Sequence, residues 1–125
     1  KENQNIISKL ILSFDKKNTF KLNTSGNELR DYVYVNDIGK FLSYIIKKNI
    51  KNLTINFATG KSYKIKNIIK MIENNYNKKL SIKHNFKKKF HEYSLSFNNK
   101  LIRKKISNFN FTSLNNFDFK EEFSK

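Results

Sequence analysis

Residues 26–41, GNELRDYVYVNDIGKF, join a strand-like segment to a helix-like one. Val33 and Val35 stand two positions apart in a segment rich in Tyr and Val, which predicts a half-buried strand over residues 29–35. The same segment contains Arg30, although only two of the 26 basic residues of the chain are arginines. The sequence therefore raises the question of why an arginine stands at this place, directly before an aspartate.

A helix is expected directly after this strand. Asn36 is of a residue type that is favoured at a helix N-cap, and Asp37 suits the positive end of the helix dipole. The apolar residues that follow at helical spacing are expected to form the buried face of this helix: Ile38, Phe41, Leu42, Ile45 and Ile46. The pattern predicts a helix that follows an N-cap at Asn36 and extends to about residue 48.

The rest of the chain alternates between helical and strand-like patterns. Helical periodicity and residue alternation predict the following further elements: a helix over 4–15, strands over 19–23, 53–57 and 80–84, a helix after an N-cap at Ser62, a charged loop over 85–92, a helix over 101–106 and a last helix near 114–119. This order is that of an α/β chain with an α+β-like character, and it predicts one domain over residues 1–125.

The chain has a formal net charge of +16, and it contains no cysteine. The excess charge comes almost entirely from lysines that are spread along the whole chain among many asparagines, so we expect a solvated surface and not a nucleic-acid site. The absence of cysteine excludes disulfides and cysteine-based zinc sites from these residues. With no apolar run long enough to span a bilayer and no signal-peptide pattern, we expect a cytoplasmic protein without membrane contact.

Two partial motifs for metal binding and catalysis are incomplete. His84 and His91, with Glu92 nearby, lack a convincing set of metal ligands, so we expect them to be loop histidines. Tyr44 and Lys48 stand at the spacing that places a catalytic phenol beside an ammonium on one helical face. An ordinary amphipathic helix explains this pair, so we expect no catalytic residue in the chain.

Two glycine motifs are incomplete as well. Residues 58–62, ATGKS, resemble the end of a P-loop without its first glycine. The glycines at positions 26, 39 and 60 cannot form the Gly-rich turn that binds a dinucleotide. We therefore expect no cofactor or metal site within these residues.

Three segments match a family pattern. Residues 25–41 are similar to a strand of the form G-x-x-x-R-D-[FY]-[VI]-x-V-x-D followed by a helix, and residues 53–73 to an N-[IL]-[GA]-x-G strand and loop. Residues 96–123 are similar to a closing segment of the form D-x-S-K-x-x-x-x-L-G-[FW]. On these motifs the chain resembles the carboxy-terminal substrate domain of the extended short-chain dehydrogenases, the NAD-dependent nucleotide-sugar epimerases and dehydratases. The resemblance implies a small substrate domain, without the Gly-rich Rossmann half, from a longer enzyme.

The resemblance also answers the question about Arg30. It implies that Arg30 binds the diphosphate of a nucleotide sugar, and a guanidinium suits this role because its rigid fork of donors matches phosphate oxygens. The alternative is a surface arginine paired with Asp31. The other positions implied to bind substrate are Tyr32 beside the nucleotide, Phe20, Lys21 and Asn23 at the base pocket, and Lys87 and Lys88 where the family has a second phosphate-binding arginine.

In the family the NAD(P) site and the proton-transferring residues belong to the missing half. The chain is therefore expected to bind a nucleotide-diphosphate sugar, to be inactive alone, and to have the Rossmann half of the same enzyme as its partner. Two alternatives stay open. A free-standing basic module for nucleic acid or another polyanion predicts a steep salt dependence, and a non-functional remnant predicts exposed hydrophobic surface. The sugar, the base and the reaction type also stay open.

Overall fold

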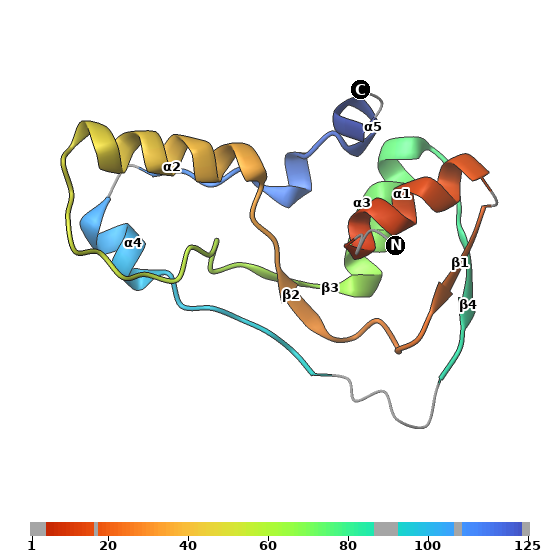
Figure 1. Cartoon of the computed structure of the whole chain (residues 1–125). Helices are drawn as coiled ribbons and strands as arrows, with labels where there is room; N and C mark the ends of the chain where they lie inside the picture. The colour runs from red at the N-terminus through yellow and green to blue at the C-terminus, as the bar shows by residue number, and fades with distance from the viewer. Residues whose placement is uncertain (1–4, 17, 87–92, 107–108, 124–125) are drawn as a thin grey trace. The chain divides into compact units, whose positions relative to one another are not determined.

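The computed structural model describes residues 5–16, 18–86, 93–106 and 109–123, and Figure 1 shows its ribbon. Contacts divide the chain into two compact units: unit 1 comprises Lys1–Leu29, Tyr63–Ser94 and Asp118–Lys125, and unit 2 comprises Arg30–Ser62 and Leu95–Phe117. The elements are α1 (Ile6–Lys16), β1 (Thr19–Leu22), β2 (Leu29–Asp31), α2 (Val35–Lys47), β3 (Ser62–Lys64), α3 (Ile65–Tyr76), β4 (Ser81–His84), α4 (Lys100–Lys105), the 3-10 helix η1 (Leu114–Asn116) and α5 (Phe119–Phe123). None of the helices in the described ranges is long and apolar enough to cross a membrane.

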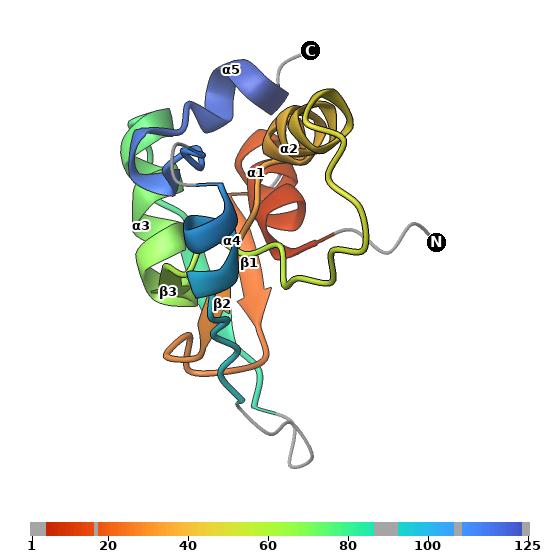
Figure 2. The ribbon, with the colours of Figure 1, turned by 90° about the vertical axis from the view of Figure 1, so that its left-hand side faces the viewer.

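Unit 1 is built on a parallel pair of strands, β1 and β4, which lie side by side in Figures 1 and 2. Phe20 pairs with Ile82 and Lys21 with Lys83 in this ladder. Helices α1 and α3 contact each other, and α5 contacts α3. The fully buried side chains of this unit include Leu10, Ile68 and Phe119, which therefore form its core. The helix predicted over 4–15 and the strands predicted over 19–23 and 80–84 are confirmed with small shifts of their ends.

The start of α3 differs from the prediction of an N-cap at Ser62. Residues 62–64 form β3, which pairs with β2 in a second two-stranded sheet, and the helix begins at Ile65. The N-cap residue of α3 makes no side-chain capping bond. Instead the backbone N–H of Ile65 donates to the carbonyl of Glu28 (3.2 Å), and that of Lys66 to the carbonyl of Gly26 (2.9 Å). A distant loop thus satisfies donors that a capping side chain satisfies in other helices.

Unit 2 contains a cluster of aromatic side chains, of which Phe41 is buried and the others are half-buried. The ring centroid of Phe41, from α2, lies 4.6 Å from that of Phe57 and 5.6 Å from that of Phe109. Phe111 lies 5.2 Å from Phe57 and 5.0 Å from Phe109. Such offset and edge-on pairs contribute about 0.5–1.5 kcal/mol each beyond the area that they bury. This cluster joins α2 to the segment between α2 and β3 and to the segment after α4.

The strand predicted over residues 53–57 is wrong. Burial alternates along this segment, with Leu53, Ile55 and Phe57 half-buried, but the segment makes no ladder with another described strand. Alternation predicts which side chains face a core, whereas a strand also needs a partner for its backbone groups. The strand predicted over 29–35 is shortened to 29–31 for a related reason, because its partner β3 has only three residues.

Asparagine takes the left-handed conformation after each of the first three helices. Asn18, Asn49 and Asn77 follow α1, α2 and α3 with φ of 49°, 49° and 50°. After α3 the N–H of Asn77 donates to the carbonyl of Asn74 and the N–H of Lys78 to that of Glu73. Glycine is the usual residue at such helix ends because it has no Cβ to clash, and asparagine is the next most common. This chain, with three glycines, uses asparagine there.

The predicted last helix is divided into η1 and α5, and Asp118 caps α5. The backbone N–H of Glu121 donates to Asp118 Oδ1 (2.9 Å), and chiefly this bond holds the pKa of the Asp118 carboxyl below its usual value of 3.8. Because the pKa is lowered in the folded chain, the ionised carboxylate stabilises the folded state above pH 3.8. This contribution is lost as the pH falls through the folded-state pKa.

We therefore expect Asp118→Asn to flatten the acid limb of the stability curve below pH 3.8, because an amide oxygen still accepts the capping bond but does not titrate. Urea unfolding at a series of pH values measures this. Asp118→Ala should lower stability at every pH because the capping acceptor is gone. An acid limb that is the same in wild type and Asp118→Asn would contradict the assignment.

Candidate functional site

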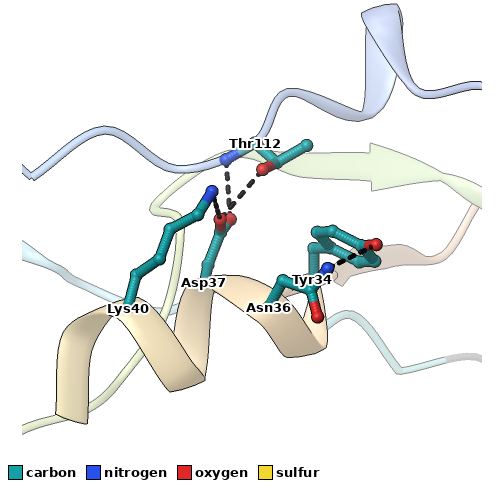
Figure 3. Close-up of polar contacts among 5 residues, drawn as sticks. All are labelled: Tyr34, Asn36, Asp37, Lys40 and Thr112. Atoms are coloured by element: carbon teal, nitrogen blue, oxygen red, sulfur yellow. Dashed lines mark hydrogen bonds and ion pairs between the residues drawn. The ribbon is translucent and has the colours of Figure 1, made fainter. Parts of the chain in front are cut away.

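Asp37 anchors the start of α2 from the inside of unit 2 (Figure 3). Its side chain is fully buried and accepts hydrogen bonds from the backbone N–H of Thr112 (2.7 Å) and from the Thr112 hydroxyl (2.9 Å). Lys40, one turn along the helix, lies 3.4 Å away with its side chain largely exposed. The sequence-based view that Asp37 has a structural role at the helix start agrees with these contacts.

The predicted N-cap at Asn36 is wrong. Helix α2 begins at Val35, and its N-cap residue is Tyr34, which makes no side-chain capping bond. The Asn36 side-chain amide instead donates to the Tyr34 hydroxyl (2.8 Å) (Figure 3). Because the carboxylate of Asp37 is bound by Thr112, a residue 75 positions away, the helix start is set by a contact that local sequence does not reveal.

Asp31, at the end of β2, binds the loop that precedes β3. One carboxylate oxygen accepts from the Thr59 hydroxyl (2.6 Å) and the Thr59 N–H (3.2 Å), and the other accepts from the Gly60 N–H (2.9 Å). These are the backbone donors that a P-loop would turn toward a phosphate. In this chain they bind the protein's own carboxylate, which gives a structural reason why the ATGKS segment is not a phosphate cradle.

Asn99 holds the other side of the same loop. Its side-chain amide donates to the Thr59 carbonyl, and its carbonyl oxygen accepts from Nε of Arg103 (3.1 Å). Gly60 has φ +71°, and a Cβ placed on it would come within 2.7 Å of the Asn99 side chain. The loop is thus enclosed between Asp31 and Asn99, and only glycine fits at position 60. We call Asp31, Thr59, Gly60 and Asn99 the loop clamp.

The predicted substrate-binding residues are found in both units. In unit 2, Arg30 lies in β2 beside the loop clamp and Tyr32 directly after the strand, both half-buried. In unit 1, Phe20 is half-buried and Lys21 exposed in β1, and Asn23 follows the strand. Lys87 and Lys88 lie outside the described residues. The sequence interpretation missed the loop clamp, although Asp31 and Gly60 both stand in motifs that carried the family resemblance.

His84 has a structural environment in unit 1. Its Nδ1 lies 3.0 Å from the Thr24 carbonyl, to which it donates, and its ring stacks on Phe86 with centroids 5.4 Å apart. The Thr24 hydroxyl in turn donates to the buried carboxylate of Glu28 (2.6 Å). His91 lies outside the described residues. Within the described ranges, no three His, Cys, Asp or Glu side chains are grouped so that they could hold a metal ion.

The glycines of this chain do not form the turn that binds a dinucleotide. Gly26 stands in the turn before β2 with φ +76°, Gly39 lies inside α2, and Gly60 belongs to the loop clamp. A dinucleotide site needs closely spaced glycines between a strand and a helix, so that backbone donors at the helix start can reach the pyrophosphate. The three glycines of this chain lie in three separate segments and do not form such a turn.

Residues 1–65 of the 125 match the family model described as the NAD dependent epimerase/dehydratase family. The chain belongs to this family. No curated protein matches the sequence. The match includes β2 and the start of α2, which carry the R-D-Y-V-Y-V-N-D run, and it therefore agrees with the family inferred from the motifs.

Solved structures of epimerases and dehydratases share the fold. A protein of Burkholderia cenocepacia J2315, provisionally assigned as an epimerase, superposes with a TM-score of 0.78 at 17% identity over 92% of this chain and 39% of its own. MoeE5 in complex with UDP-glucuronic acid and NAD gives 0.71 at 14% identity over 90% and 38%. The dTDP-glucose 4,6-dehydratase of Bacillus anthracis str. Ames, in complex with NAD, gives 0.69 at 13% over 82% and 33%.

These likenesses bear on the fold. They confirm the expected class, a small α/β portion of the extended short-chain dehydrogenase fold. The chain spans between 33% and 39% of the length of these three proteins. NAD is bound in the complexes of MoeE5 and of the dehydratase, so cofactor binding is a property of those chains.

Proposed function

We propose that this chain is the nucleotide-sugar-binding part of an NAD-dependent sugar epimerase, dehydratase or reductase. The observation that carries the proposal is the place of Arg30, in a family-typical R-D-Y strand that ends at the loop clamp. Arg30 would bind the diphosphate. This reading is supported by the family membership and by the complex of MoeE5 with UDP-glucuronic acid.

The chemistry of the other proposed residues follows from their types. Tyr32, two positions after Arg30, would border the nucleotide in unit 2. Phe20 offers a ring face for a base, while Lys21 and Asn23 offer donors to its edge or to the ribose. Lys87 and Lys88 would add positive charge for the diphosphate without the paired donors of an arginine.

We propose further that the chain has no activity of its own. NAD(P), when bound by a complete family member, supplies hydride transfer. The glycines of this chain do not fit that cofactor, so the chemistry requires a Rossmann-type partner in addition to the sugar nucleotide. The residues proposed here bind and orient the substrate.

Arg30→Ala tests the proposal. Isothermal titration of the chain with UDP-glucose should show saturable binding, and Arg30→Ala should weaken it by about tenfold to a hundredfold, because hydrogen bonds to a charged group contribute about 1.5–3 kcal/mol each. Arg30→Lys should recover part of the affinity, since it restores charge but not the fork. Lys104→Ala, which removes one charge from the exposed face of α4, is the matched control and should bind as wild type does.

The same titration addresses the basic-module alternative. The proposal is wrong if a DNA oligomer binds, if its affinity falls steeply with salt, and if Arg30→Ala has no larger effect than Lys104→Ala. The chain is then a polyanion-binding module. UDP-glucose binding that survives the removal of Arg30 would also contradict the proposed role of that residue.

One observation bears on the remnant alternative. Helix α2 exposes four aliphatic side chains at helical spacing, Val35, Ile38, Leu42 and Ile46, with exposures of 68%, 40%, 53% and 78%. The prediction of a buried face is therefore wrong for Ile38, Leu42 and Ile46, whereas Phe41 is buried as predicted. We call these four residues the α2 stripe. An uncovered apolar stripe is what that alternative predicts, and it is equally expected of a substrate-binding part that docks on another surface. Saturable UDP-glucose binding would distinguish the two, because a remnant has no reason to retain it.

A further inference from the structure

The carboxylate of Asp31 attaches the end of β2 to the loop that precedes β3. It lies at the end of a three-residue strand, is half-buried, and accepts three hydrogen bonds from two consecutive residues, Thr59 and Gly60. Hydrogen bonds to an ionised acceptor are roughly twice as strong as neutral ones. A strand as short as β2 has few ladder bonds of its own, so these contacts supply much of what holds its end in place.

The loop to which Asp31 binds has little freedom to move. Gly60 adopts a left-handed conformation, and the buried side chain of Asn99 holds the Thr59 carbonyl from the other side. Asn99 is itself held by Nε of Arg103. The loop clamp is thus a fixed support to which the end of β2 is attached.

Arg30 and Asp31 are consecutive residues of one strand. Successive side chains of a strand point to opposite faces, so the face that Asp31 turns to the loop determines the face from which Arg30 projects. A rotation of the strand end that released Asp31 would carry Arg30 away from its place as well.

We propose that Asp31 is the positioning residue for Arg30. Its attachment to Thr59 and Gly60 orients the guanidinium, and the affinity for a diphosphate therefore depends on hydrogen bonds that do not touch the ligand. Preorganisation of this kind matters for an arginine because its free side chain loses about 2 kcal/mol of rotamer entropy when it is fixed. This inference rests on the proposed function, since it assumes that Arg30 binds the diphosphate.

A double-mutant cycle with UDP-glucose as the ligand tests the inference. Asp31→Asn is expected to weaken binding by about tenfold in wild type, within the range of typical coupling between sites. In the Arg30→Ala background it should have no effect, because there is no guanidinium left to position. Thr59→Val, which removes the hydroxyl donor with little change of shape, should show the same dependence on Arg30 with a smaller effect.

The outcomes separate this inference from the proposed function. If wild type does not bind UDP-glucose, the proposed function fails, and this inference fails with it. If wild type binds and Arg30→Ala binds more weakly, but Asp31→Asn weakens binding equally in both backgrounds or not at all, only the inference is overturned. Loss of folding in both Asp31→Asn and Thr59→Val would also overturn it, because the contacts would then serve the fold and not Arg30.

Discussion

Asp37→Ala is expected to lower the free energy of unfolding of unit 2 by about 3 kcal/mol or more. The side chain is completely buried, and its carboxylate accepts two hydrogen bonds from Thr112, at 2.7 and 2.9 Å. Each hydrogen bond to a charged acceptor contributes about 1.5–3 kcal/mol, and its loss leaves the donors without a partner. The contact also joins residues 75 positions apart, so its removal takes away one of the contacts between α2 and the segment after α4.

Urea unfolding followed by circular dichroism measures this change, and hydrogen exchange of the α2 amides shows whether it lies in unit 2. Lys40→Ala is the matched control. Its ammonium lies 3.4 Å from the same carboxylate but its side chain is 65% exposed, so its loss should cost less than about 1 kcal/mol. If the two variants are equally stable, Thr112 is not the partner that holds Asp37.

Gly60→Ala is expected to destabilise the chain by roughly 3 kcal/mol. At φ +71° a side chain costs about 1–2 kcal/mol. The new Cβ would also lie 2.7 Å from two atoms of Asn99, which must then move and give up its bond to the Thr59 carbonyl. A buried hydrogen bond that is lost in this way adds about 1–3 kcal/mol.

Gly39→Ala is the matched control for Gly60→Ala. It makes the same chemical change inside α2, where a Cβ meets no atom within 4 Å, and it should stabilise the helix by about 0.5–1 kcal/mol. Combining Gly60→Ala with Asn99→Ala should cost less than the sum of the single changes, since the second removes the atoms of the clash. Thermal unfolding that showed the same shift for Gly39→Ala and Gly60→Ala would contradict the loop clamp.

Elements with a strong apolar period could be predicted from the sequence. The pattern of α3 predicts Ile65, Ile68, Ile69 and Ile72 on one face, and all four are buried. What could not be predicted were boundaries set by distant groups. Helix α3 starts at Ile65 because Glu28 and Gly26 accept its first amides, and nothing near Ser62 indicates this.

The candidate site was predicted in part for the same reason. Arg30 could be identified as a candidate from the sequence because arginine is rare in this chain and because Arg30 stands in a motif typical of the family. The loop clamp beside Arg30 could not be predicted from the sequence. Its residues Asp31, Gly60 and Asn99 lie in three separate motifs, and only the folded backbone brings them together. The role of Arg30 in substrate binding stays a prediction.

The asparagines that end α1, α2 and α3 have a consequence for the unfolded chain. An asparagine has fewer accessible backbone states than a glycine, so a chain that uses Asn18, Asn49 and Asn77 at these positions has less conformational entropy to lose on folding. Each of them accepts some steric strain in the native state in return. Compared with glycine at the same three helix ends, asparagine therefore lowers the entropy lost on folding and raises the steric strain of the folded state. The path of the backbone stays the same.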